Sequence, residues 1–175
     1  MLERIRFLTA GESHGKGLLG IIEGLPSNIK ISETYVKQHL SRRQKGHGRG
    51  GRMKIEDDFA EFIGGVRYGE TLGGPIGLQI KNKDWENWKD VMDHNIPEKP
   101  SKPITMLRPG HADLAGLKKF GMNDIRNILE RSSARETTMR VALGSFCRKM
   151  LEDIGVEIGS RVVQIHNIKD IQDIE

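Results

Sequence analysis

The sequence reads SARETTMRVALGSFCRKMLEDI at residues 133–154, and this stretch carries the strongest helix signal of the chain. Its apolar residues recur every three or four positions, as the buried face of an amphipathic helix requires. These residues are Leu143, Phe146, Cys147, Met150, Leu151 and Ile154. Ser133 and Glu136 have the spacing of a capping box, and Gly155 is a typical residue after a helix end. We predict a helix over residues 134–153.

Around this helix the chain alternates short apolar runs with glycine- and proline-rich breaks. Residues 5–9 and 18–22 are predicted strands separated by the turn-rich residues 11–17, and residues 25–28 are a second break. Residues 59–68 and 75–82 predict an antiparallel hairpin around Gly73 and Gly74. A further strand is expected over residues 156–165.

Ser32 is a plausible N-cap for a second helix that runs to about Arg43 with Val36 and Leu40 turned inward. A short helix is expected over residues 111–120, after an extended connector marked by prolines at 97, 100 and 103. Strands outnumber helices without a regular strand–helix–strand alternation. This order predicts the α+β class with antiparallel sheets and disfavours a doubly wound parallel sheet.

The composition is that of a soluble protein. The 175 residues fit a single domain, and 36% of them are apolar and 30% charged. No apolar run approaches the roughly 18 residues that span a bilayer. Residues 1–6 carry three charged side chains, so we expect no secretory signal and a cytoplasmic location. Cys147 is the only cysteine, which excludes a disulfide within the chain and a thiolate metal cluster.

Positive charge is concentrated in one segment. Residues 34–55 contain seven lysines and arginines and no acidic residue, while the rest of the chain has 21 basic and 24 acidic residues. A small, multiply charged anion is therefore a better candidate partner than a broad nucleic-acid surface.

Residues Gly11 to Gly15, GESHG, match the G-x-S-x-G pattern of a serine hydrolase elbow. Such an elbow leads directly into a helix, whereas residues 16–22 are broken by glycine and resemble a strand, which disfavours a hydrolase. Two other interpretations stay open. The segment is either a tight turn with Ser13 in solvent, or a turn whose backbone N–H groups and His14 face a ligand.

Residues 46–51, GHGRGG, match the G-x-G-x-x-G dinucleotide fingerprint, but the end of a basic helix precedes them and no amphipathic helix follows. The arginines around this loop suit a phosphorylated, carboxylated substrate, because guanidinium groups bind both anions in a bidentate manner. They are Arg42, Arg43, Arg49 and Arg52. A solvated basic loop or an RNA contact is the alternative. RNA is disfavoured because residues 36–58 lack aromatic side chains for base stacking.

Two further segments carry candidate functional groups. In RPGHAD, residues 108–113, His111 follows a proline-fixed turn, where a lone histidine is usually structural. With His14, however, it provides a pair that can divide acid and base roles near neutral pH. In RSSARE, residues 131–136, hydroxyls and arginines stand at a helix start, where an anion is favoured. His39, His94 and His166 have no metal-ligand spacing, and we expect no metal site.

These segments, residues 11–15, 42–53, 108–113 and 131–137, resemble the chorismate synthase family in order and spacing. The resemblance covers essentially the whole chain, but members of this family are considerably longer. It implies that residues 1–175 are the N-terminal part of a single domain whose C-terminal part is absent. The implied fold is a β-α-β sandwich, with layers of antiparallel sheet and helices, and the implied assembly is a homotetramer.

The implied activity is that of a carbon–oxygen lyase acting on phosphate in the shikimate pathway of aromatic amino-acid biosynthesis. A 1,4-anti elimination of phosphate from 5-enolpyruvylshikimate 3-phosphate gives chorismate and requires reduced FMN without net redox change. The partner is thus a small molecule, with no nucleic acid or membrane. The resemblance also associates NADP with the family, and the sequence leaves open whether flavin reduction is intrinsic or external.

The resemblance also implies roles for single residues. His14 would protonate the leaving phosphate and His111 the reduced flavin. The cofactor-binding segment is matched by Arg131, Ser132 and Ser133. The substrate would be bound by Arg43 and Arg49, with Arg108 and Arg135 as further candidates.

Overall fold

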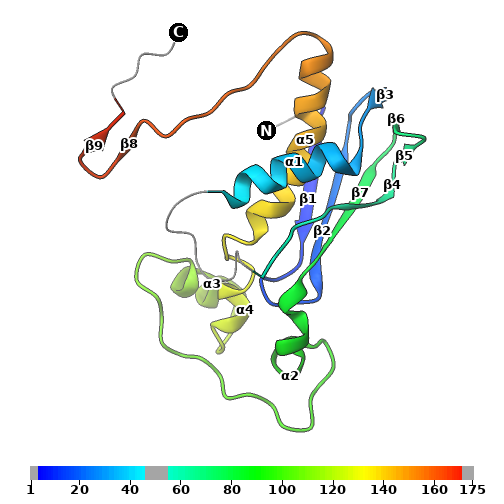
Figure 1. The fold of residues 1–175 in the computed structure, drawn as a ribbon. Coiled ribbons are helices and arrows are strands. Elements are labelled where there is room, and N and C mark those ends of the chain that lie inside the picture. Colours follow the sequence, from blue (N-terminus) through cyan, green and yellow to red (C-terminus); the bar gives the residue numbers. More distant parts are fainter. Residues whose placement is uncertain (1–3, 46–54, 171–175) are drawn as a thin grey trace.

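A four-stranded antiparallel sheet forms the centre of the computed structural model, which describes residues 4–45 and 55–170. Its strands lie in the order β1 (Arg6–Ala10), β2 (Gly17–Glu23), β7 (Ile76–Lys81) and β4 (Glu61–Gly64) (Figure 1). The predicted strand–loop–strand unit over residues 5–22 is confirmed, because β1 and β2 pair antiparallel across the turn at residues 11–16. The antiparallel pairing of β4 with β7 is confirmed as well.

The connection between β4 and β7 differs from the predicted hairpin around Gly73 and Gly74. Two short strands intervene, β5 (Val66–Arg67) and β6 (Glu70–Leu72), and they form a second sheet with β3 (Ser27–Lys30) in the order β3-β6-β5. The β5–β6 turn has positive φ at both Tyr68 and Gly69, as a tight hairpin turn requires. The predicted break over residues 25–28 is therefore only half right, because β3 begins within it.

Both long helices lie where the sequence places them. Helix α1 (Glu33–Gln44) begins after Ser32, whose hydroxyl accepts the backbone N–H of Tyr35 at 3.2 Å. Helix α5 (Glu136–Asp153) matches the predicted 134–153. The predicted capping box is wrong, because the Glu136 carboxylate instead accepts the Thr9 hydroxyl of β1 at 2.6 Å and binds Arg140. Tertiary contact with β1 has replaced the local cap.

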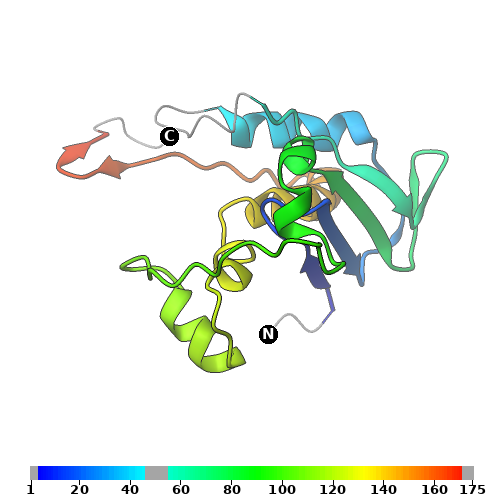
Figure 2. The same cartoon turned by 90° about the horizontal axis from the view of Figure 1, so that it is seen from below.

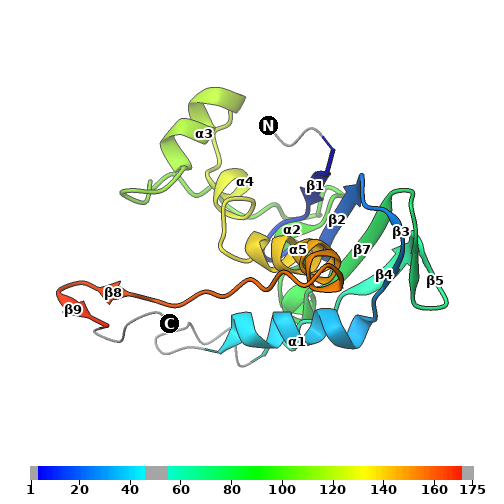
Figure 3. The same cartoon turned by 90° about the horizontal axis from the view of Figure 1, so that it is seen from above.

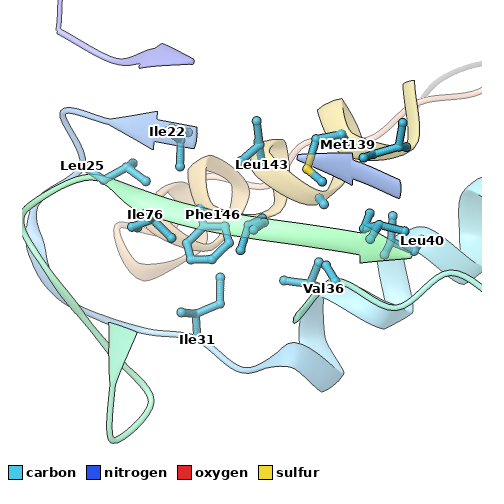
Figure 4. Packing of buried hydrophobic residues seen from close by; sticks show 14 of the residues in the cluster. Ile22, Leu25, Ile31, Val36, Leu40, Ile76, Met139, Leu143 and Phe146 are labelled. Atoms are coloured by element: carbon cyan, nitrogen blue, oxygen red, sulfur yellow. The ribbon is translucent and has the colours of Figure 1, made fainter. Parts of the chain in front are cut away.

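The core lies between the four-stranded sheet and these two helices, which cover one face of the sheet (Figures 1 and 3). Met139, Leu143 and Phe146 of α5 point toward the sheet, together with apolar residues of β2, β7 and α1 (Figure 4). Gly20 of β2 lets α5 approach closely, since a Cβ atom there would lie 2.5 Å from the Met139 sulfur. Cys147 packs at the edge of this core, as predicted, whereas Ile154 at the helix end is exposed.

Short helices follow β7 and precede α5 in the chain. After β7 come the 3₁₀ helix η2 (Lys83–Asn87) and α2 (Lys89–Met92), followed by the extended connector that the prolines predict. Helix α3 (Asp113–Phe120) confirms most of the helix expected at 111–120, and α4 (Arg126–Leu129) was not predicted. Figures 1, 2 and 3 show α3 and α4 beyond the first turn of α5 and away from the strands.

The strand predicted over residues 156–165 is wrong except at its end. Residues 156–163 have no regular structure, and only β8 (Gln164–Ile165) pairs with β9 (Ile168–Lys169) in a small hairpin. This segment leaves the body of the protein in all three views (Figures 1, 2 and 3). Its alternating pattern finds no sheet to join among the described residues. None of the described helices combines the length and apolar character needed to cross a membrane.

Candidate functional site

The Gly11–Gly15 turn joins β1 to β2 and has a backbone that only glycine accommodates at its first position. Gly11 has a φ of 102°, and a Cβ atom there would lie 2.2 Å from the Gly17 carbonyl oxygen. Asn82, which follows β7, donates its side-chain N–H groups to the carbonyls of Glu12 at 3.1 Å and Gly15 at 2.8 Å. The end of a neighbouring strand thus holds the turn in shape.

The segment between α4 and α5 holds the same turn from the other side. The Ser13 N–H donates to the Glu130 carbonyl at 3.0 Å. The Arg131 guanidinium donates to the carbonyl oxygens of Thr9 at 2.7 Å and Gly11 at 3.3 Å. Ser13 is 5% exposed, and a strand follows the turn where a hydrolase elbow needs a helix. The solvated-serine and hydrolase interpretations are therefore both wrong.

His14 lies between a carboxylate and an indole ring. Its Nδ1 atom is 2.8 Å and 3.0 Å from the two carboxylate oxygens of Glu130, and its backbone N–H donates to Glu130 Oε2 at 2.9 Å. The imidazole stacks on Trp88 with ring centroids 3.9 Å apart and planes inclined by 24°. The His14 side chain is 22% exposed and that of Glu130 only 1%. A buried acid therefore supports a partly accessible histidine.

Two cationic side chains lie near tryptophan rings of the segment that contacts this histidine. The Arg126 guanidinium lies 5.7 Å from the Trp88 ring centroid. Lys16, two residues after His14, has its Nζ atom 5.6 Å from the Trp85 ring centroid and 3.5 Å from His94 Nδ1. Positive charge in this region suits an anionic substrate.

Arg135, expected to bind substrate, is buried among internal partners. Its side chain is 6% exposed, forms ion pairs with Asp58 and Glu56, and donates to Asn82 Oδ1 at 2.9 Å. Asp58 and Glu56 are themselves 0% and 2% exposed. Asn82 also binds the Gly11–Gly15 turn, so Arg135 and its two carboxylate partners are connected to the turn through Asn82.

Arg43, at the end of α1, is committed to the start of α5. It donates to the Ala134 carbonyl at 2.8 Å and to the Thr137 hydroxyl at 2.9 Å, and lies 4.0 Å from Asp58. Its neighbour Gln44 donates to the Glu56 carbonyl at 2.9 Å. Arg49, Arg52 and the glycine fingerprint at residues 46–51 lie outside the described residues.

Arg108 and Asp113 form a bidentate ion pair, with Nε 3.0 Å from Oδ2 and Nη2 2.8 Å from Oδ1. Hydrogen bonds from the Arg108 side chain and backbone lower the pKa of the buried Asp113 carboxyl to about 2. His111 is exposed and precedes α3, and its Nδ1 lies 3.2 Å from the Pro109 carbonyl oxygen. No hydrogen bond or ring contact joins His111 to His14 in the part of the chain that the structure describes.

The three residues expected to bind a cofactor differ in how free their donors are. Ser132 is exposed, with its hydroxyl 3.5 Å from the Leu129 carbonyl, while the Ser133 hydroxyl accepts the Arg135 N–H at 3.3 Å. Arg131 is 40% exposed although it binds Thr9 and Gly11. The first N–H groups of α5 are used locally, by the carbonyls of Ser133 and Ala134. The Ser132 hydroxyl and the Arg131 guanidinium are thus the donors that fit an anionic group.

Sequence reasoning missed several residues that build this site. Glu130 and Asn82 carry no motif, and Trp88 lies in a segment with weak periodicity. The predicted anion-binding segment at residues 131–136 begins directly after Glu130 and was the nearest signal to it. Among the described residues, no group of three or more histidine, cysteine, aspartate or glutamate side chains is placed to hold a metal ion.

Comparison with known proteins places these features in a family. The family model for chorismate synthase matches residues 5–175. Chorismate synthase of Aquifex aeolicus (strain VF5) is 55% identical over 175 residues, which are 99% of this chain and 44% of the relative. That of Sulfurihydrogenibium sp. (strain YO3AOP1) is 57% identical over 98% of this chain and 44% of the relative.

A solved structure titled "Crystal Structure of Chorismate Synthase" has a TM-score of 0.74 and 44% sequence identity to this chain. The match covers 97% of this chain and 41% of that chain. The chain therefore spans less than half the length of the relatives it matches. The structural match also confirms the predicted α+β fold with layers of antiparallel sheet and helices. On the family model and the identity of these relatives together, the chain belongs to the chorismate synthase family.

Proposed function

We propose that the full-length protein eliminates phosphate from 5-enolpyruvylshikimate 3-phosphate in a 1,4-anti sense and forms chorismate, as a carbon–oxygen lyase of the shikimate pathway. Membership of the family supports this proposal. The observation that carries it is His14, which lies 2.8 Å from the buried Glu130 carboxylate on the Gly11–Gly15 turn, with the cationic Lys16 two residues further along the chain. That arrangement suits proton donation to a departing phosphate.

The elimination requires a proton for the leaving phosphate and electron density at an allylic carbon. We assign the proton to His14, whose ring is partly accessible at 22% exposure. Reduced FMN, when bound, supplies the electron density without net redox change. We assign its binding to Arg131, Ser132 and Ser133, and a proton transfer at the cofactor to His111. The reduced form of NADP, NADPH, is proposed only as the source of reducing equivalents for the flavin.

The arginines divide into two groups by their surroundings. We keep Arg108 and Arg43 as proposed substrate ligands. The Arg108 side chain is 38% exposed although it pairs with Asp113, whereas the Arg43 side chain is 12% exposed and also binds Ala134 and Thr137 at the start of α5. Arg49 completes the proposed substrate set. Arg135 is 6% exposed and already holds two carboxylates, so we propose that it acts indirectly, through Asn82 and the turn.

The test is an anaerobic assay of the full-length protein with the substrate and reduced FMN, in which chorismate is quantified by chromatography. His14→Ala and His111→Ala should each lower turnover by roughly 10²–10⁴-fold, the range for loss of a general acid or base. His166→Asn in the exposed β8–β9 turn is the matched control and should retain wild-type turnover. Near-normal rates in both active-site variants, with circular dichroism unchanged, would refute the assigned roles.

The same protein preparation tests the alternatives. A fluorophosphonate that labels Ser13 would support a hydrolase, against the burial of that serine. Salt-dependent RNA binding lost on replacing Arg49 and Arg52 would support a nucleic-acid function. We expect neither, and we expect the 175 residues alone to be inactive because they span less than half of the relatives.

We further propose a homotetramer that works in the cytoplasm. The sheet face opposite α5 exposes Leu8, Leu19 and Ile21, of which Leu8 and Ile21 are partners across β1 and β2. A cluster of exposed apolar side chains is typical of a contact surface. Sedimentation of the full-length protein measures the assembly directly.

A further inference from the structure

Glu130 binds His14 through both its backbone and its side chain. The Glu130 carbonyl accepts the Ser13 N–H at 3.0 Å, and Glu130 Oε2 accepts the His14 N–H at 2.9 Å. The same carboxylate lies 2.8 Å and 3.0 Å from His14 Nδ1. With 1% of its side chain exposed, Glu130 has little access to water that would replace these partners. Its position is therefore defined relative to the backbone of the turn as well as to the ring.

A carboxylate only accepts hydrogen bonds. When Oε2 accepts the His14 backbone N–H, the nearby Nδ1 must carry a hydrogen to make a favourable contact with the same carboxylate. A lone pair on Nδ1 would face two acceptor oxygens within 3.0 Å. The arrangement therefore selects the Nδ1–H tautomer in the neutral ring and leaves Nε2 to exchange a proton.

Trp88 restrains the ring in the remaining direction. Its indole stacks on the imidazole at 3.9 Å, and its own Nε1–H donates to Asp84 Oδ2 at 3.0 Å. Rotation of the imidazole about its Cβ–Cγ bond would break this stacking and the contact with Glu130 together. The Glu130 carboxylate thus contacts the edge of the imidazole at Nδ1, and the Trp88 indole contacts its face.

We propose that Glu130 is a positioning residue for His14. It holds the neutral ring as the Nδ1–H tautomer against Trp88, so that Nε2 takes up a proton from solvent and then transfers this proton to the leaving phosphate, which returns the ring to the neutral Nδ1–H form. This inference rests on the proposed function for its kinetic consequence, whereas the tautomer itself is a property of the protein alone. Correct orientation of a proton donor contributes to the rate of proton transfer without contributing to substrate binding.

The first experiment requires no variant of Glu130. Solid-state NMR of the full-length protein labelled with ¹⁵N-histidine reports which ring nitrogen carries hydrogen in the neutral imidazole, and His14→Gln identifies the His14 signals by their loss. We expect a protonated Nδ1 and an unprotonated Nε2. A neutral His14 protonated at Nε2 would overturn the proposal, whether or not the protein forms chorismate.

The second experiment compares Glu130→Gln with Glu152→Gln. The amide of Glu130→Gln has one acceptor oxygen and an NH₂ group that can donate to Nδ1, so the tautomer should shift toward Nε2–H. We expect kcat to fall by roughly 10²-fold or more while KM stays within about threefold, because orientation is lost and binding is kept. Glu152 binds Tyr35 and Arg148 away from the turn, and its variant should change neither the ¹⁵N signals nor kcat.

Glu130→Asp separates positioning from folding, because it keeps a carboxylate but shortens its reach. It should retain the fold and recover part of the activity lost in Glu130→Gln. A kcat in folded Glu130→Gln within threefold of wild type would overturn the positioning role. Failure of the wild-type protein to form chorismate would refute the proposed function, and the ¹⁵N signals would still decide the tautomer.

Discussion

Replacing Arg135 by methionine should destabilise the protein far more than the loss of an ordinary surface arginine. The guanidinium is 6% exposed and pairs with Asp58 and Glu56, whose side chains are 0% and 2% exposed. Methionine fills much of the volume but leaves two carboxylates buried without a counter-charge. Removing one partner of a buried ion pair typically costs about 3–5 kcal/mol.

Arg140→Met is the matched control, because Arg140 pairs with Glu136 one turn away on α5 but is 56% exposed. Pairs of this exposed kind contribute only about 0.3–0.5 kcal/mol. The two arginines occupy the same helical region, so the difference between their variants isolates the effect of burial. We therefore expect the two losses of stability to differ by roughly tenfold.

Urea titration of the full-length protein, followed by far-ultraviolet circular dichroism without substrate or cofactor, measures the free energy of unfolding. Adding Asp58→Asn and Glu56→Gln to Arg135→Met removes the uncompensated charges and should recover a substantial part of the loss. A loss below about 1 kcal/mol in Arg135→Met would refute the structural role and return Arg135 to the arginines proposed to bind substrate.

Two further predictions concern packing and pH. Gly20→Ala should cost about 1–3 kcal/mol because the new Cβ atom would lie 2.5 Å from the Met139 sulfur. Gly144→Ala, in open space on α5, should instead add about 0.5–1 kcal/mol, and urea titration that gave both the same sign would contradict this. Hydrogen bonds from Arg108 lower the pKa of Asp113 from 3.8 to about 2, so the stability from this pair is present above pH 4 and is lost as the pH falls toward 2. Urea midpoints between pH 2 and 5 should lose that part of their pH dependence in Asp113→Asn, and an unchanged dependence would argue against the pair.

The elements predicted correctly depend on signals within a few residues of themselves. Helix α1 is defined by the Ser32 cap and by Val36 and Leu40 one turn apart, and α5 by its apolar repeat. Strands β5 and β6 have two and three residues, too few to show a period. The strand prediction for residues 156–165 was wrong for a different reason. An alternating apolar pattern forms a strand only where a neighbouring strand is available for pairing, and residues 156–163 have no such neighbour among the described residues.

In the candidate site, too, the sequence identifies residues by their type and spacing but does not show their surroundings. Residue types and spacing identified His14, His111 and the arginines as candidate functional residues, because proton transfer and anion binding need those groups. They did not distinguish the exposed Arg108 from the buried Arg135, since exposure depends on what packs around a side chain.

The two long helices, the β1–β2 unit, the glycine turn that presents His14, and the family can all be predicted from the amino-acid sequence. The packed fold was needed to show that Glu130, 116 positions along the chain, holds that histidine, and that Asn82 and Arg135 hold the turn. The difference arises because helix and turn signals come from neighbouring residues. A hydrogen bond between distant segments exists only once the sheet and α5 have packed together.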